Sequence, residues 1–412
     1  MNEPPLLRFL ALVALVGTYL GLGLGHVPGL RLDRTGIAII GATVMVVGGV
    51  IRWDQAVAAV DAQTLVLIFG MMVVTAYLRL SGFFALVTAW MIRRTTTPAG
   101  LLAAIVVTSG VLSALFVNDV VCLVLAPLIL EVTRQLDLPP RAYLIALATS
   151  SNVGSVATLV GNPQNMLVGS FSGLSYRSFL VRQAPVAIIG MTCVFAAVWL
   201  AYRRQLPRVL RAAPRRERIP VHYPLMIKTT TVVAAMLVAF LAGFPVALVA
   251  IAGAACSLLT RQVKPEKVYR EIDWEVLVLF IGMFVLIGAA EAAGIAQQLL
   301  AAAQAANLKD TAVFTAITAV LSNLVSNVPA VLLLKPVVPS LPDPTRAWLL
   351  LAMASTLSGN LTIVGSVANL IVVEAARKHG VRIGFLEYCR LGLPLTLVTL
   401  LLGWLILISL PA

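Results

Sequence analysis

The stretch LSALFVNDVVCLVLAPL, residues 112–128, is apolar almost throughout but carries an Asn–Asp pair at its centre, Asn118 and Asp119. Apolar flanks of this length predict a segment buried in a protein core or in a membrane. A carboxylate at the centre of a bilayer costs about 3 kcal/mol or more unless it pairs or takes up a proton. The pair therefore marks a turn or a functional group inside a buried segment.

The composition of the whole chain decides between a core and a membrane. Of its 412 residues, 60% are hydrophobic and only 11% are charged, whereas soluble proteins carry about 25% charged residues. Long apolar segments recur from one end to the other. The sequence therefore predicts an all-α polytopic membrane protein. It offers no soluble domain and no nucleophile–base pair, so we do not expect an enzyme.

The net charge of +13 comes from basic residues that lie mostly in short segments between apolar runs. This pattern follows the positive-inside rule, so we expect membrane lipid around the chain and no nucleic acid as a partner. The four cysteines show neither disulfide nor metal-ligand spacing, and we expect no metal and no cofactor. The first apolar segment has no basic region ahead of it, which predicts a membrane span rather than a cleaved signal peptide.

The sequence contains an internal repeat, with one copy on either side of an Arg-rich segment. We expect a first repeat over residues 1–202, a basic linker over 203–224 and a second repeat over 225–412. Three pairs of segments align, each at its own constant offset: 60–82 with 272–294, 112–127 with 321–336, and 158–168 with 362–372. The matches include Gly, Asn, Ser and Pro positions, which apolar composition alone would not align.

Each half is expected to have five spans, one of them broken, plus a re-entrant hairpin. Segment 100–133 is too long for one span, and its two arms of roughly 15 residues are too short to cross separately. A hairpin turning near Asn118 and Asp119 fits both lengths, and its partner would turn near Asn327–Pro329. The motifs VGNPQN (160–165) and VGSVAN (364–369) predict helices broken within the membrane, where such backbone must line a cavity or be buried in protein.

An odd number of spans in each half makes the two repeats inverted relative to each other. With the linker in the cytoplasm, the loops holding Arg93, Arg134, Lys264 and Arg377 also fall inside, as the positive-inside rule requires. We therefore expect an integral protein of a bacterial inner membrane, with a cytoplasmic linker and both termini extracytoplasmic.

Two hairpin turns and two broken helices related by inversion are expected to meet near the middle of the bilayer, as in secondary transporters. The side chains delivered there are mostly amides and hydroxyls, which donate and accept hydrogen bonds. The predicted substrate-binding residues are Ser113, Asn118, Thr158, Asn162 and Asn165 of the first half, and Ser322, Asn323, Asn327, Thr362, Ser366 and Asn369 of the second. They suit a small polyhydroxy or oxyanion ligand or a partly dehydrated cation; for each one singly, interhelical hydrogen bonding is an equal alternative.

Asp119 is the one carboxylate at a predicted hairpin turn, and its equivalent in the second half is the apolar Val328. We predict that it couples transport to protons or another cation such as sodium. A structural role as the cap of the hairpin's second helix is the alternative, and the two roles are compatible. Asp61 and Asp273 open helices, where an acidic side chain stabilises the N-terminus, and Lys335 is expected to extend to an interface.

These motifs resemble those of the ion transporter superfamily. SALFVNDVVCLVLAPLIL (113–130) is similar to the hairpin signature of the arsenite/antimonite efflux permease branch, and SNLVSNVPAVLL (322–333) and GNLTIVGSVANLIVVE (359–374) resemble its second hairpin and second broken helix. GNPQN (161–165) is more like the P-protein and anion-transporter side. As partners, the resemblance implies a small inorganic solute and protons, and it allows a partner ATPase and a homodimer.

The sequence predicts a secondary transporter with proton-coupled efflux of arsenite or antimonite as its function. A sodium-coupled inorganic or dicarboxylate anion transporter, a sodium/proton antiporter and a channel remain the alternatives.

Overall fold

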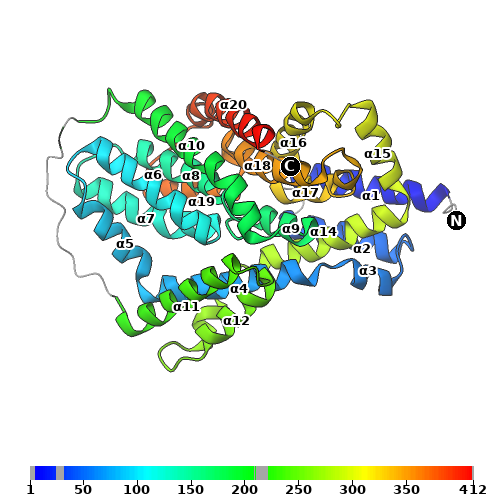
Figure 1. The fold of residues 1–412 in the computed structure, drawn as a ribbon, viewed down its shortest axis with the longest axis horizontal. Coiled ribbons are helices and arrows are strands. Elements are labelled where there is room, and N and C mark those ends of the chain that lie inside the picture. Colours follow the sequence, from blue (N-terminus) through cyan, green and yellow to red (C-terminus); the bar gives the residue numbers. More distant parts are fainter. Residues whose placement is uncertain (1–4, 25–31, 208, 210–220, 411–412) are drawn as a thin grey trace.

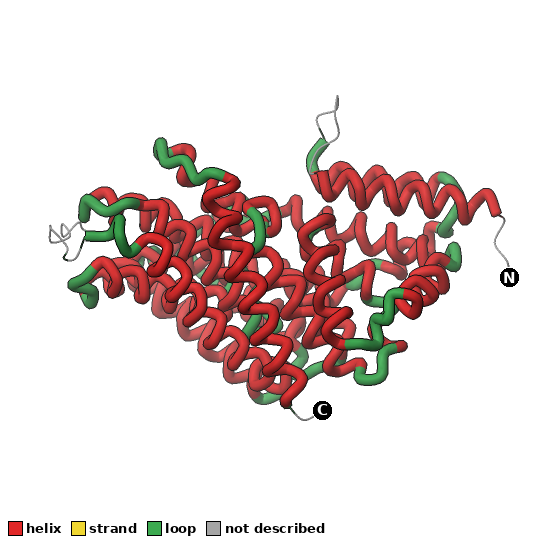
Figure 2. Tube along the Cα trace, turned by 90° about the horizontal axis from the view of Figure 1, so that it is seen from above, coloured by secondary structure: helices red, strands yellow, loops and turns green. Residues whose placement is uncertain are grey.

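The computed structural model describes residues 5–24, 32–207, 209 and 221–410, and this part of the chain consists of helices and loops without a strand (Figure 2). The first half contains α1 (Pro5–Leu24), α2 (Arg34–Val47), α3 (Trp53–Ala59), α4 (Ala62–Ser81), α5 (Phe83–Arg93), α6 (Pro98–Leu115), α7 (Asn118–Gln135), α8 (Pro140–Ser155), α9 (Pro163–Ser172) and α10 (Tyr176–Tyr202). The second contains α11 (Tyr223–Leu241), α12 (Val246–Leu258), α13 (Pro265–Tyr269), α14 (Trp274–Ala292), α15 (Ile295–Ala305), α16 (Thr311–Val325), α17 (Asn327–Leu334), α18 (Pro344–Leu357), α19 (Val367–Lys378) and α20 (Phe385–Ser409).

Seven helices in the described residues are long and apolar enough to cross a membrane, namely α1, α4, α6, α10, α11, α14 and α20. Six of these are among the ten expected spans, and α6 is the first arm of the expected hairpin. The remaining expected spans are the short helices α2 and α12 and the two broken segments α8–α9 and α18–α19. The prediction of an all-α membrane protein is confirmed.

Two segments expected to be single helices are each divided by a glycine. Residues 63–91 form α4 and α5, which meet at Gly82 with φ = +82°, and residues 274–303 form α14 and α15, which meet at Gly294 with φ = +75°. Glycine adopts this left-handed conformation without the steric cost that a Cβ atom brings. Gly82 and Gly294 end the first pair of aligned repeat segments, so both halves bend at the same place.

The first hairpin differs in length from the prediction. Its two arms, α6 and α7, have 18 residues each, about 27 Å, so neither is too short to cross. The argument from arm length is therefore wrong for both arms. That the hairpin is re-entrant stays a prediction, because helix lengths alone do not place it within the bilayer.

The halves exchange matching contacts through α2, α4, α12 and α14. A Cβ atom on Gly70 of α4 would lie 2.7 Å from the carbonyl carbon of Ala250, and one on Gly282 of α14 would lie 3.0 Å from that of Ala38. Gly282 is the repeat equivalent of Gly70, and Ala250 follows Ala38 at the same offset. Small residues allow such close backbone packing in membrane helices. The two contacts are those that related halves would make with each other; the inversion of one half stays a prediction.

Two sets of helices pack closely among themselves. Figure 1 shows α6, α7, α8 and α19 side by side, with α4, α11 and α12 grouped below them, and the contacts within each set are extensive. Helices outside these two sets add further contacts, including those of α9 with α4 and with α17, and that of α17 with α14. The second hairpin and α9 therefore lie next to α4 and α14.

Several ends of helices lie on one side of the molecule, which we call the linker side. The backbone N–H of His222, just after the basic linker, donates to Ser81 O at the end of α4 (3.0 Å). Arg79 pairs with Glu271, in the loop before α14. Thr35 Oγ1, at the start of α2, donates to Glu275 O at the start of α14 (3.1 Å). The starts of α2 and α14 therefore lie on the linker side.

Candidate functional site

Both hairpin turns and both helix breaks contribute to one small cavity of about 80 Å³, the central cavity. The first hairpin turns between α6 and α7, and the second turns at Ser326, which has φ = +81°. The polar and charged lining residues are Arg34, Asn118, Asp119, Gln164, Ser326, Asn327 and Ser366, and the apolar ones are Leu22, Pro163, Val276, Leu279, Phe280, Val328, Pro329 and Val367. The convergence expected from the sequence is present in the fold.

Asn152 of α8 joins the first hairpin to the second broken helix. Its Oδ1 accepts hydrogen bonds from Asn118 Nδ2 (3.0 Å) and Ser366 Oγ (3.0 Å). Its Nδ2 donates to the Oδ1 atoms of Asn360 (2.8 Å) and Asn369 (3.1 Å). Asn152 is buried and uses both ends of its amide. These bonds fix the orientation of the neighbouring amides as well.

A second polar cluster joins the second hairpin to the first broken helix. With the Asn327 amide oriented to satisfy both of its atoms, Nδ2 donates to Ser355 O (3.0 Å) and Gly365 O (3.2 Å), and Oδ1 accepts from Gln164 Nε2 (3.2 Å). Gln164 Nε2 also lies 3.1 Å from Thr356 Oγ1. Thr356 is the repeat equivalent of Asn152 at the offset that relates the two broken helices, so each half supplies a polar side chain from the same helical position.

The two helix breaks are held by the same hydrogen bonds. Asn165 Nδ2 donates to Ser155 O (3.0 Å) and Thr158 O (2.9 Å). Asn369 Nδ2 donates to Gly359 O (2.7 Å) and Thr362 O (3.0 Å). Donors and acceptors of the first set match those of the second, one for one, at the offset of the broken helices. These two asparagines satisfy carbonyl groups that the broken helices leave without helical partners.

Four of the predicted site residues line the central cavity, namely Asn118, Asp119, Asn327 and Ser366. The others lie behind its wall or elsewhere: Ser113, Thr158, Asn162, Asn165, Ser322, Thr362 and Asn369 belong to the hairpins and breaks, and Asn323 lines a separate apolar groove between α16 and α20. Asn162 caps α9 by accepting from Asn165 N (2.8 Å), and Thr158 Oγ1 donates to Ala114 O.

The sequence analysis missed Arg34, Asn152, Gln164, Thr356 and Asn360. Polar side chains inside apolar helices were an available signal for Asn152 and Thr356, and their equivalence in the repeat strengthened it. Arg34 gave no such signal, because it lies at the end of a span, where a basic residue is ordinary.

Two oxygen acceptors remain open at the first hairpin. Asn118 is only 3% exposed, and its Oδ1 has no hydrogen-bond partner among the described residues. The Asp119 carboxylate lies next to it on the same cavity wall, with the backbone N–H of Ala368 at the start of α19 directed at it. A buried acceptor without a partner costs about 1–3 kcal/mol, so this wall favours a solute that donates hydrogen bonds.

The described residues contain no group of three or more His, Cys, Asp or Glu side chains able to hold a metal ion. Cys122 is buried behind the first hairpin, where its Sγ donates to Ser151 Oγ (3.2 Å). It is therefore not placed to act as a ligand in the central cavity.

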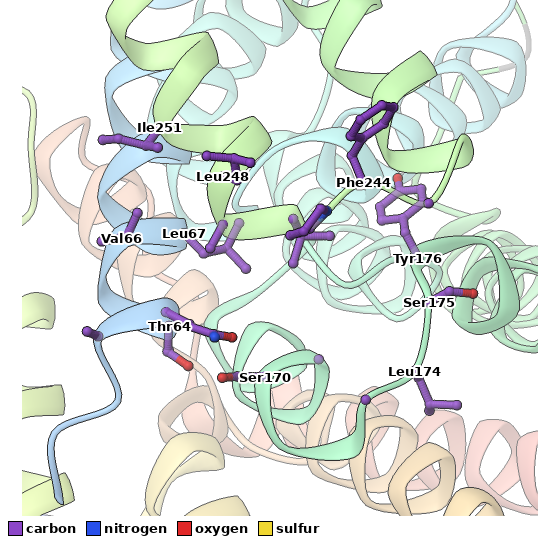
Figure 3. A pocket seen from close by; sticks show the side chains of 18 residues that line it. Thr64, Val66, Leu67, Ser170, Leu174, Ser175, Tyr176, Phe244, Leu248 and Ile251 are labelled. Carbon is purple, nitrogen blue, oxygen red and sulfur yellow. The ribbon is translucent and has the colours of Figure 1, made fainter. Parts of the chain in front are cut away.

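Two larger hollows lie at the start of α4, away from the linker side. The Lys335 cleft, of about 550 Å³, is lined by residues 58–63, 170, 171, 284, 287, 288, 291, 332 and 335. The Tyr176 cleft, of about 640 Å³, lies between α4 and the loops 173–175 and 243–245. Figure 3 shows Tyr176 and Phe244 facing each other at one end of it and Thr64 and Ser170 at the other. The Tyr176 cleft is the largest of the three, but it contains neither hairpin turn and is not the candidate site.

Comparisons with known proteins identify the family and the fold of this chain. A family model described as "CitMHS: Citrate transporter" matches residues 26–346. An uncharacterized transporter of Mycobacterium tuberculosis (strain CDC 1551 / Oshkosh) is 30% identical, and the match covers 90% of this chain and 93% of the relative. The silicon efflux transporter LSI3 of Oryza sativa subsp. japonica is also 30% identical, with 92% and 93% covered. The crystal structure of the YdaH transporter of Alcanivorax borkumensis shares the fold, with a TM-score of 0.63 at 18% identity over 99% of this chain and 98% of that one.

Proposed function

Because this chain belongs to the citrate transporter (CitMHS) family, within the ion transporter superfamily that its motifs resemble, we propose that it exports a neutral metalloid hydroxide in exchange for protons. It is an integral membrane transporter. Arsenite and antimonite, which are neutral trihydroxides near pH 7, are the proposed substrates. The proposal includes other neutral metalloid hydroxides, because a relative with 30% identity is named for silicon efflux.

The observation that carries the proposal is the pair of open acceptors in the central cavity. Asn118 Oδ1 has no hydrogen-bond partner among the described residues, and the Asp119 carboxylate, at which the Ala368 N–H is directed, keeps further acceptor positions. A trihydroxide supplies three O–H donors and carries no charge that would have to be neutralised inside the membrane. Arg34, which also lines the cavity, carries guanidinium N–H groups that can donate to the oxygens of the trihydroxide.

Citrate fits this cavity poorly. A carboxylate substrate has no donor for Asn118 Oδ1, and it would meet the negative charge of Asp119. Arg34 is the one basic residue among the described residues that line the cavity. A tricarboxylate also exceeds a space of about 80 Å³, in which only a few non-hydrogen atoms find room.

Proton exchange follows from the chemistry of Asp119. As a carboxylate it accepts strong hydrogen bonds from the substrate through either oxygen, whereas as a carboxylic acid one oxygen carries a proton and becomes a donor, and only a weaker, neutral acceptor remains. Substrate and proton therefore compete for one group. A transporter that changes sides with either one bound, but not with an empty charged site, exchanges them.

We place the linker in the cytoplasm and both termini outside, as the distribution of basic residues favours. The central cavity, whose lining includes Arg34 and Val276 of the linker side, then faces the cytoplasm. An exporter takes up its substrate from that side.

Everted membrane vesicles with an imposed proton gradient test the proposal. We expect arsenite to accumulate in them, and an uncoupler that collapses the gradient to abolish the accumulation. Vesicles that carry the Asp119→Asn protein serve as the control, because this variant keeps the shape of the site. Uptake of citrate or sulfate that follows a sodium gradient would contradict the proposal.

Sodium/proton exchange is the second candidate, because Asn118 Oδ1 and Asp119 are also oxygen ligands for a small cation. The guanidinium group of Arg34 at the same cavity opposes it by repelling cations. A sodium gradient that acidifies or alkalinises proteoliposomes without any metalloid present would favour this candidate.

A further inference from the structure

The central cavity and the Lys335 cleft follow one another along α14. Val276 and Phe280 line the central cavity, whereas Phe284 and Glu291 line the Lys335 cleft. Phe280 and Phe284 are four residues apart, which is about 6 Å along a helix axis. Only a thin layer of side chains therefore separates the site from a cleft on the opposite side.

This layer is aromatic. The ring of Phe284 packs edge-on against Phe280, with centroids 6.0 Å apart, and against Phe171 at 6.4 Å. Trp348 of α18 packs on the other side of Phe171 at 6.5 Å. Phe171, near the end of α9, thus connects three helices that belong to different parts of the fold.

Lys335 holds Phe171 from the second hairpin. Its Nζ lies 4.3 Å from the centre of the Phe171 ring, well within the range of a cation–π interaction. No ion pair of Lys335 is present among the described residues. That Lys335 extends to a membrane interface stays a prediction, and the contact that the structure shows for its ammonium group is the one with Phe171.

The neighbouring residue, Ser170, ties α9 to α4. Its Oγ lies 3.0 and 2.9 Å from the two carboxylate oxygens of Asp61, to which it donates. Asp61 also caps α4 by accepting from Thr64 N (2.7 Å). A hydrogen bond to a charged group contributes more than a neutral one, and this one joins α9 to the start of α4.

The equivalent positions on the linker side cannot form such a contact. At the offsets of the repeat, Ser170 corresponds to Glu374, Phe171 to Ala375 and Lys335 to Ala126. Asp61 corresponds to Asp273, so a hydroxyl–carboxylate pair on one side is matched by two carboxylates on the other. Two carboxylates cannot form the hydrogen bond that joins Ser170 to Asp61, and the Glu374 carboxylate pairs with Arg377 instead (3.0 Å).

We infer that Phe171, held by Lys335 and by the Ser170–Asp61 hydrogen bond, is a one-sided lock that closes the path between the central cavity and the Lys335 cleft. The lock stabilises the state in which the site is reached from the linker side. Only the following statement rests on the proposed function: in the absence of substrate, the empty site of the exporter faces the cytoplasm.

Thiol accessibility tests the lock without any transport assay. Leu279 lines the central cavity but carries no polar group, so Leu279→Cys, in a protein whose four native cysteines are replaced, reports from which side a reagent reaches the cavity. We expect a membrane-impermeant thiol reagent to label this cysteine from the linker side only. In Phe171→Ala, labelling from the opposite side should rise at least tenfold.

Milder variants separate the parts of the lock. Phe171→Leu keeps most of the volume but loses the ring, and Lys335→Met keeps the length but loses the charge; both should raise labelling from the cleft side roughly 2- to 30-fold, the range of a cation–π contribution. Lys335→Arg should restore the wild-type pattern. Ser170→Ala should raise labelling, whereas Ser170→Thr should not. Phe195→Ala, which removes a half-buried ring of α10, is the matched control and should change nothing.

Two results would overturn the inference. One is labelling of Leu279→Cys from the cleft side in the otherwise unaltered protein. The other is unchanged labelling in Phe171→Leu and Lys335→Met while the linker side remains accessible. Because no metalloid enters the experiment, its failure would leave the proposed substrate untouched, and failure of arsenite transport would leave the lock untouched.

Discussion

The two hairpins hold the neighbouring helix breaks through equivalent asparagines, but only the first hairpin carries a charged residue at its turn. Asn118 and Asn327 both hold the helix break beside them, Asn118 through its backbone N–H to Gly161 O (3.0 Å) and Asn327 through its amide to Gly365 O (3.2 Å). The next residue is Asp119 in the first hairpin and Val328 in the second. Under the proposed function, the two hairpins line the binding site together, and Asp119 of the first hairpin is the group that takes up a proton.

The largest effect is expected from removing that charge. Asp119→Asn keeps the shape of the turn but cannot change its protonation state, so pH-driven exchange should fall by about 100-fold or more, as is typical when a proton-transfer group is lost. Vesicle uptake measured from pH 6 to 8 should become independent of pH. Retention of the wild-type pH dependence would exclude Asp119 as the coupling group.

Exchanging the two residues tests the comparison itself. The double variant Asp119→Val with Val328→Asp moves the carboxylate to the second hairpin, away from the Ala368 N–H that faces Asp119 in the first. We expect folded protein, visible as a single peak in size-exclusion chromatography, with transport no better than that of Asp119→Asn. Restored exchange would show that a carboxylate at either hairpin turn is sufficient for proton coupling.

Asn152→Ala is expected to have the next largest effect. It leaves Asn118 Nδ2, Ser366 Oγ and the Oδ1 atoms of Asn360 and Asn369 without their partner. Unsatisfied buried groups cost about 1–3 kcal/mol each, so thermal stability in detergent should fall clearly, together with transport. Thr356→Ala at the equivalent position removes fewer bonds and should cost less.

The two tip asparagines should differ in a measurable way. Asn118→Ala removes an open acceptor for the substrate, so the apparent KM for arsenite should rise about tenfold, the value of one good hydrogen bond. In Asn327 both ends of the amide are used within the protein. Asn327→Ala should therefore lower thermal stability more than Asn118→Ala does, and it should raise the apparent KM less. The opposite ranking would move the substrate to the second hairpin.

The smallest difference is expected between two equivalent serines. Ser322 Oγ donates to Ser355 O (2.9 Å), whereas Ser113 Oγ has no partner among the described residues. Ser322→Ala should destabilise the protein by about 1 kcal/mol, and Ser113→Ala should be nearly neutral. Thermal unfolding of the two variants side by side measures this.

Much of this architecture could be predicted from the residues. The apolar segments and the repeat offsets predicted helices, hairpins and breaks, and the motif around Asp119 predicted the superfamily. The helix ends at Gly82 and Gly294 were missed, because a glycine within an apolar run is compatible with both a continuous helix and a bend until its neighbours are known.

The sequence by itself determined the environment and the plan of this protein, because hydropathy and repeated polar positions depend only on the order of residues. Only the tertiary structure decided which of the polar candidates reach the cavity. Asn118, Asp119, Asn327 and Ser366 face it, while Asn165 and Asn369 turn inward to satisfy broken helices. The physical reason is that an amide serves a ligand or a backbone carbonyl equally well, and which of the two it meets is set by packing between segments that lie far apart in the chain.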